Sequence, residues 1–106
     1  MVRVVINCAF GGFQLTRKAT EMIAARGNAL AIEDLTLVQF YGFAFSDHER
    51  RTDPDLVAVI EEIGNIAGNG TSLKVIDIPD DVKWYIDEYD GAESIHEEHR
   101  VWRGDE

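Results

Sequence analysis

The sequence predicts an α+β fold in which one mainly antiparallel sheet carries two packed helices and ends in a β-hairpin. Two observations predict this class. Short β-branched or aromatic runs alternate with two stretches of helical spacing, and an Asp-Gly dipeptide separates two alternating runs near the C-terminus. The 106 residues fit one domain, 1–106, which is long enough to bury a core without disulfides.

The N-terminal part of the chain predicts a strand followed by a helix. Residues 2–7, VRVVIN, form a continuous β-branched run that is typical of a buried strand. Thr16 is a suitable N-cap, apolar residues recur after it at helical spacing, and Gly27 stands where a helix commonly ends. We therefore expect a helix over about residues 16–26.

The middle of the chain predicts a second strand and a second helix. Residues 36–45, TLVQFYGFAF, are aromatic and β-branched, which favours a strand that is bent or bulged at Gly42. The segment DPDLVAVIEEIG then offers Asp53 as an N-cap and Pro54 as the first helical residue. The following segment, GNIAGNGTS, breaks the helical period and predicts a loop.

The C-terminal part predicts a strand over 72–79 and then a hairpin that turns at Asp90-Gly91. Alternation on the first hairpin strand puts Trp84 and Tyr85 on opposite faces. One aromatic set is then expected in the core and the other at an interface or a stacked ligand. Residues 92–102 also tolerate helical spacing, so a helix stays open there.

The hairpin register brings two like charges together. It pairs Ile86 with Ile95, which suits a common apolar face, but it also pairs Glu88 with Glu93. Two carboxylates directly opposite one another are unfavourable unless a cation lies nearby.

The charge balance excludes a general nucleic-acid binder, because the net charge is -10. No apolar run is long enough for a membrane span, and no leader pattern is recognised at the N-terminus. The single cysteine, Cys8, suits a reducing cytosol and is expected to be a small buried hydrophobic residue.

The placement of the few cations is informative in such an acidic chain. Arg17 and Lys18 open a helix whose N-terminus already carries positive dipole charge. The turn Gly11-Gly12-Phe13 precedes it, and free backbone N–H groups there would attract an anion such as phosphate. The alternative is a tight turn with solvated cations.

Two further arginine sites are candidates for ligand contacts. Arg50 and Arg51 could hold a phosphate bidentately, or they could pair with the nearby carboxylates of Asp47, Glu49 or Asp53. On a strand, Arg100 and Trp102 would share a face and could hold a phosphate and stack a base. The alternative is a core tryptophan with an arginine at its edge.

Neither metal chemistry nor catalysis is predicted. His96 and His99 would point to opposite faces of a strand, so no metal site is expected there. No arrangement nominates a nucleophile, and the numerous carboxylates are explained by a solvated acidic face. We expect no cofactor and no enzymatic activity.

Four stretches together resemble a known family: VVINCAFGGFQLT, RTDPDLVAVIEEIG, LKVIDIPDDVKWYIDEYDG and ESIHEEHRVW. They are similar to the first described family of phage-encoded Thoeris anti-defence proteins, over about residues 2–102. The resemblance implies a non-enzymatic protein that acts in the host bacterial cytoplasm. It would sequester cyclic ADP-ribose immune signals, and some members also hold the cyclic oligonucleotides of CBASS immunity.

The resemblance further implies a homo-oligomer, a dimer or a dimer-based hexamer, with ligand pockets at subunit interfaces. Combined with the cation and aromatic placement, it nominates as ligand-binding residues Gly11, Gly12, Phe13, Arg17, Arg50, Arg51, Arg100 and Trp102. The chain departs from the family pattern at Ala9-Phe10 and at Thr16-Arg17, which bears on ligand identity more than on fold.

Two other functions stay open. The carboxylate density of DIPDD and IDEYDGAESIHEE is typical of an acidic protein that inhibits a host protein by direct binding. A small assembly protein with only an oligomer interface would bind no small molecule.

Overall fold

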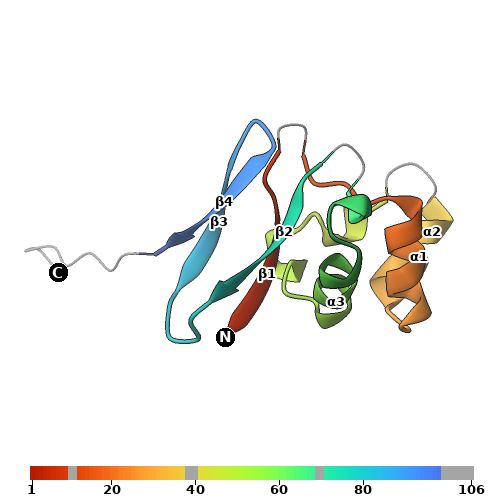
Figure 1. Cartoon of the computed structure of the whole chain (residues 1–106), viewed down its shortest axis with the longest axis horizontal. Helices are drawn as coiled ribbons and strands as arrows, with labels where there is room; N and C mark the ends of the chain where they lie inside the picture. Colours follow the sequence, from red (N-terminus) through yellow and green to blue (C-terminus); the bar gives the residue numbers. More distant parts are fainter. Residues whose placement is uncertain (10–11, 38–40, 69–70, 99–106) are drawn as a thin grey trace, which may run out of the picture.

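The fold has three layers: a group of helices, a first two-stranded sheet and a second two-stranded sheet (Figure 1). The computed structural model describes residues 1–9, 12–37, 41–68 and 71–98. The α+β class and the C-terminal hairpin are confirmed. The elements in chain order are β1 (Val2–Asn7), α1 (Arg17–Ala25), α2 (Ala29–Leu37), short 3₁₀ turns at Phe43–Phe45 and His48–Arg50, α3 (Pro54–Ile63), a 3₁₀ turn at Gly64–Ala67, β2 (Leu73–Ile78), β3 (Trp84–Tyr89) and β4 (Ala92–Glu97).

The first sheet pairs β1 with β2 antiparallel and forms the middle layer (Figure 1). Successive side chains of β1 point alternately to two apolar clusters, one on each face of this sheet. Val5 packs among the helices, whereas Val4 and Ile6 pack against the second hairpin. Because both faces of β1 are covered along its second half, Val4, Val5 and Ile6 form an uninterrupted buried apolar run, as predicted for a buried strand, whereas Arg3 is exposed.

The helix-start predictions for α1 and α3 are confirmed. The Thr16 side chain accepts the backbone N–H of Ala19 at 3.2 Å, and Gly27 follows α1 with φ of 86°. The Asp53 carboxylate accepts the N–H groups of Asp55 and Leu56 at 2.9 and 3.2 Å. Such side-chain caps satisfy backbone donors that a helix leaves unpaired at its start.

The predicted strand over 36–45 is wrong. Its first two residues end helix α2, residues 38–40 lie outside the described part, and Phe43–Phe45 form a 3₁₀ turn. Gly42 has φ of 90°, and a Cβ there would lie 2.9 Å from the Leu15 backbone nitrogen. Glycine is therefore required here because two backbone segments pack closely, and not because a strand bulges.

Helix α2 begins at a cap that the sequence analysis overlooked. The Asn28 side-chain oxygen accepts the backbone N–H groups of Leu30 and Ala31 at 3.0 and 3.2 Å. Its amide nitrogen donates to the carboxylates of Asp53 and Asp55, so one asparagine joins the starts of α2 and α3. The bonds from Asn28 and Arg26 lower the pKa of Asp55.

The bend after α2 is held by the buried carboxylate of Asp34. It accepts the backbone N–H of Gly42 at 2.6 Å and that of Ala44 at 3.4 Å. Burial nevertheless raises the pKa of Asp34 above the ordinary value of 3.8.

The Asp34 pKa predicts a pH-dependent stability. The folded state binds this proton more tightly than the unfolded state, so the contribution of Asp34 falls as pH rises above about 3.8 toward the raised pKa. The stability advantage of wild type over Asp34→Asn should therefore shrink between pH 4 and pH 7 in urea unfolding. Glu62→Gln, at an exposed position of α3, serves as the control, and a gap that is constant with pH would contradict this prediction.

The second sheet is the hairpin β3–β4, with the register that the sequence predicts. Ile86 lies opposite Ile95 and Glu88 opposite Glu93. The turn residues Asp90 and Gly91 both have positive φ, 52° and 88°, as a type I′ turn requires. Residues 92–97 therefore form a strand in place of the alternative helix. Residues 99–102, where a helix also stayed open, lie outside the described part.

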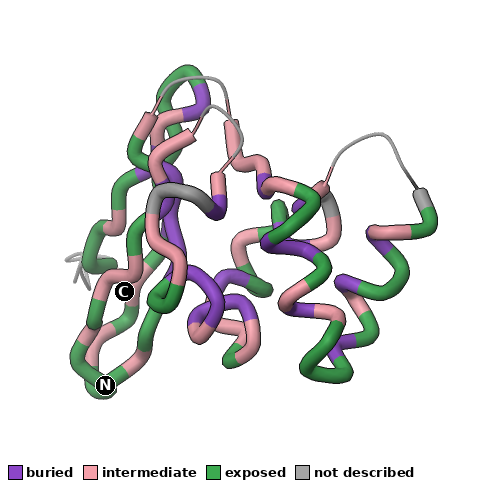
Figure 2. Tube along the Cα trace, turned by 45° about the vertical axis from the view of Figure 1, so that its right-hand side comes forward, coloured by how far each residue is buried: buried purple, intermediate pink, exposed green. Residues whose placement is uncertain are grey.

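The hairpin covers the first sheet with one face and leaves the other open. Trp84 and Ile86 pack with Val4 and Ile6, so the Trp84 face is the core face. On the opposite face Tyr85 is 47% and Tyr89 is 79% exposed, and Figure 2 shows mostly exposed and intermediate colours along this hairpin.

Cys8 was expected to be buried, and this is wrong, because it follows β1 at an exposed position. None of the helices in the described ranges has the length and apolar character needed to cross a membrane.

Candidate functional site

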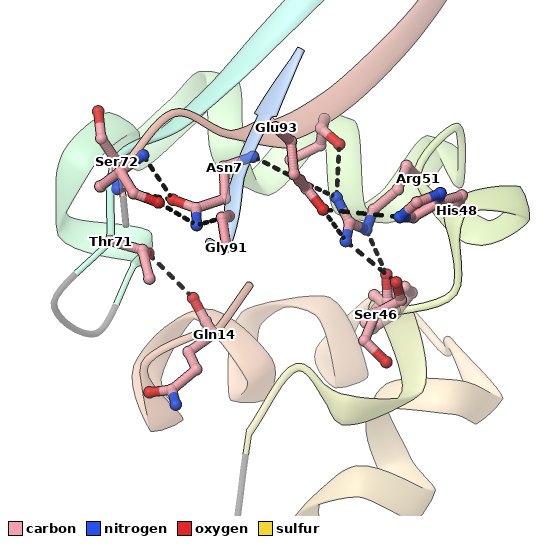
Figure 3. Close-up of polar contacts among 12 residues, drawn as sticks. Asn7, Gln14, Ser46, His48, Arg51, Thr71, Ser72, Gly91 and Glu93 are labelled. Carbon is pink, nitrogen blue, oxygen red and sulfur yellow. Dashed lines mark hydrogen bonds and ion pairs between the residues drawn. The ribbon is translucent and has the colours of Figure 1, made fainter. Parts of the chain in front are cut away.

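A buried ion pair lies where the hairpin meets the helical layer. The guanidinium of Arg51 donates from Nη1 and Nη2 to the two carboxylate oxygens of Glu93, at 2.5 and 2.8 Å (Figure 3). The two side chains are only 1% and 3% exposed. This bidentate pair supplies the cation that the opposed Glu88 and Glu93 require.

Arg51 uses all of its hydrogen-bond donors inside the protein. Besides the two bonds to Glu93, Nε donates to the Phe45 carbonyl at 2.6 Å and Nη2 to the Ser46 carbonyl at 3.0 Å. Nη1 also donates to the Val5 carbonyl at 3.3 Å. A guanidinium has five N–H donors, so this arrangement leaves none for a ligand.

Phe13 completes this cluster from the other side. Its ring centroid lies 3.9 Å from the Arg51 guanidinium carbon, a cation–π contact. The backbone also takes part, because the Arg51 carbonyl accepts the N–H of Val5 at 2.9 Å. Phe13 and Arg51, two of the nominated ligand residues, thus come together as a support for β1, β4 and the 46–51 segment.

The end of β1 is held by a second buried polar residue, Asn7. Its backbone N–H donates to Glu93 Oε1 at 2.8 Å, and its side-chain nitrogen donates to the carbonyls of Ala9 and Gly91 (Figure 3). Its side-chain oxygen accepts the N–H groups of Ala9 and Ser72. Asn7 therefore ties the hairpin turn to the first sheet.

The other nominated residues lie apart from this cluster. Arg17 is exposed at the start of α1 and pairs with Glu21 one turn later at 2.8 Å. Arg50 donates to the Ala44 carbonyl at 2.9 Å. Gly12 has φ of 91°, which favours glycine. Gly11, Arg100 and Trp102 lie outside the described residues, so their roles stay predictions.

A groove of about 380 Å³ lies between the 3₁₀ turn His48–Arg50 and strand β3. Its volume falls within the range of small-molecule sites. The lining residues are His48, Glu49, Thr52, Trp84, Tyr85 and Ile86. The ring of Tyr85 stacks on His96 of β4 on the open face of the hairpin, with centroids 5.6 Å apart.

Two other hollows lie elsewhere on the described surface. One of about 460 Å³ lies between the start of β1 and α3, where Arg3 is already paired with Glu61 and Asp77. One of about 270 Å³ lies on the far side of Trp84, beside Pro79 and Val82. The groove at His48 combines aromatic rings, a hydroxyl and an imidazole, which makes it the best candidate for a ligand.

The sequence analysis did not single out His48 or Thr52. Both stand within the SDHERRTDP segment, which was noted only for its arginines. The available signal was the hairpin prediction that Trp84 and Ile86 share a face, but nothing local indicated which loop lies against that face. Comparison of the chain with protein-family models, with curated proteins and with solved structures finds no match. A function must therefore be argued from the site itself.

Proposed function

We propose that this protein binds and sequesters a cyclic ADP-ribose-type signal, with cyclic oligonucleotides as related ligands, and does not cleave it. The observation that carries the proposal is the groove of about 380 Å³ with Trp84 and Tyr85 in its wall. Base stacking on aromatic side chains is a common means of nucleotide recognition. The family resemblance of the sequence points to the same class of ligand and to the cytoplasm of a host bacterium.

The groove offers different chemistry at its two sides. Trp84 provides a ring for an adenine, because it shares a face of β3 with the lining residue Ile86. Thr52 and His48 provide hydrogen-bond donors on the opposite side. We propose retention of the ligand in place of cleavage because the family that the sequence resembles is non-enzymatic.

The first test is calorimetric titration with two cyclic ADP-ribose isomers and a cyclic trinucleotide, followed by heating to recover the ligand. We expect binding of at least one of these, with the ligand released intact. Trp84→Leu, which keeps an apolar side chain, should weaken binding roughly 10- to 100-fold, because a base–aromatic stack contributes about 1–3 kcal/mol.

Tyr89→Ala is the matched control. Tyr89 lies on the same strand as Trp84 but on the open face, where it is 79% exposed and does not line the groove. Equal losses in both variants would contradict the groove assignment, and recovery of altered ligand would mean an enzyme. Light scattering of the same samples tests the proposed homo-oligomer.

A second candidate function is inhibition of a basic host protein by direct binding. The open face of the hairpin presents Tyr85 and Tyr89 on either side of Asp87. Other exposed carboxylates lie on the hairpin and in the segments beside it: Asp80, Asp81, Glu88, Asp90, Glu97 and Glu98. Capture from host lysate at low salt should recover a basic partner that is lost at high salt, since exposed charge contacts are screened. Failure to recover one at low salt counts against this function.

A further inference from the structure

Three potential metal ligands meet beside the groove. The ligand atoms of His48, Glu88 and Glu93 all lie within 4.8 Å of one another. They come from three elements: the 3₁₀ turn His48–Arg50 and the two paired strands of the hairpin, β3 and β4. Two ligands of one metal ion at about 2.1 Å each lie roughly 3–4 Å apart. The exposed ends of His48 and Glu88 could reach this spacing by small rotations.

The Glu93 carboxylate has room for one more partner. Oε1 accepts two hydrogen bonds, from Arg51 Nη1 and from the Asn7 backbone. Oε2 accepts one, from Arg51 Nη2. A carboxylate has about four lone-pair sites, so one on Oε2 is unused. His48 Nε2 lies 3.8 Å from this oxygen, too far for a hydrogen bond but suitable for two ligands of a shared ion (Figure 3).

The local charge also favours a cation. Glu88 and Glu93 carry two negative charges, and Arg51 compensates only one of them. Within the described ranges Glu88 has no ion-pair partner. Since a histidine and two carboxylates form a ligand set suited to Zn²⁺ and Mn²⁺, we propose that His48, Glu88 and Glu93 bind one divalent transition-metal ion.

Such an ion gives an acidic protein a means of holding an anionic ligand. His48 belongs both to this cluster and to the lining of the groove. Three protein ligands leave a coordination position open, and a phosphate oxygen of a nucleotide in the groove is a suitable fourth ligand. The proposal that the ion binds is independent of the proposed function, whereas the proposal that the ion holds a phosphate rests on that function.

The test is calorimetric titration of chelator-treated protein with MnCl₂ or ZnCl₂ alone. We expect one ion per chain for wild type, and a loss of at least about tenfold in affinity for Glu88→Gln. This variant removes the like-charge pair, so it should fold at least as well as wild type. Asp87→Asn, on the opposite face of the same strand, is the control and should bind the ion normally.

The outcomes separate the two proposals. Absence of metal binding, or an equal loss in Glu88→Gln and Asp87→Asn, overturns the metal site. Nucleotide binding that is unchanged by a chelator overturns the phosphate bridge and leaves the proposed function standing. Metal binding with no affinity for any nucleotide overturns the proposed function and leaves the metal site standing.

Discussion

Arg51→Met is expected to destabilise the folded state by about 3–5 kcal/mol in urea unfolding at pH 7. The substitution leaves the Glu93 carboxylate buried without a cation, because that side chain is only 3% exposed. It also removes the donors bonded to the carbonyls of Val5, Phe45 and Ser46. Each buried acceptor left without a partner adds to the destabilisation.

Arg50→Met is the matched control for this variant. Arg50 is the adjacent residue and is exposed, and its guanidinium makes one described bond, to the Ala44 carbonyl. Its loss should change stability by about 0.5–1 kcal/mol. Replacing both members of the pair, as Arg51→Met with Glu93→Leu, should recover part of the loss because no unpaired charge stays buried. Equal effects of Arg50→Met and Arg51→Met would contradict the structural role assigned to Arg51.

If Arg51→Met fails to fold, Arg51→Lys tests the same ion pair with Glu93. Lysine retains the positive charge but has three donors on one nitrogen in place of a planar fork of five. We expect an intermediate loss of stability. A lysine variant as stable as wild type would mean that the charge alone matters.

The parts of the fold that the sequence predicts are those fixed by neighbouring residues. The cap at Thr16 acts three residues away, and the turn at Asp90-Gly91 sets the hairpin register directly. The burial of β1 on both faces was also predictable, because an uninterrupted apolar run such as residues 4–6 must be shielded from water on both faces. These signals act over a few residues and need no knowledge of the rest of the chain.

The segment 36–45 shows where local preference fails. Its aromatic and β-branched residues favour a strand, but Asn28 starts a helix upstream, and Asp34 binds the backbone at Gly42. Gly42 packs against Leu15, which lies far away in the sequence. Tertiary contacts therefore decide the conformation of this segment, and composition does not reveal them.

One part of the candidate site could be predicted from the unfavourable like-charge pair in the hairpin register. The opposed Glu88 and Glu93 required a nearby cation, and the structure supplies Arg51, 42 residues from Glu93 in the chain. Sequence reasoning nominated Arg51 as a phosphate contact and offered only adjacent carboxylates as alternative partners. The groove itself could not be predicted, because it forms only where the segment at His48 meets β3.

Asn7→Ala is expected to destabilise the protein by about 2–3 kcal/mol, as measured by urea unfolding. Asn7 is fully buried, and its side chain is the partner of the Gly91 carbonyl and of the Ser72 backbone N–H. Without it, backbone groups at the hairpin turn and at the start of β2 are left without a partner. We also expect faster amide hydrogen exchange in β3 and β4 than in α3, because the hairpin loses a main attachment to the first sheet.

Ser72→Ala is the control that separates the asparagine side chain from its surroundings. It keeps the backbone N–H that donates to Asn7 and removes only a hydroxyl, so its effect should be small. If Asn7→Ala accelerated exchange equally in the helices and in the hairpin, the residue would support the whole fold instead of anchoring this layer. A selective effect on β3 and β4 would link the position of the groove to Asn7, because Trp84 and Tyr85 enter the site only while the hairpin lies on the first sheet.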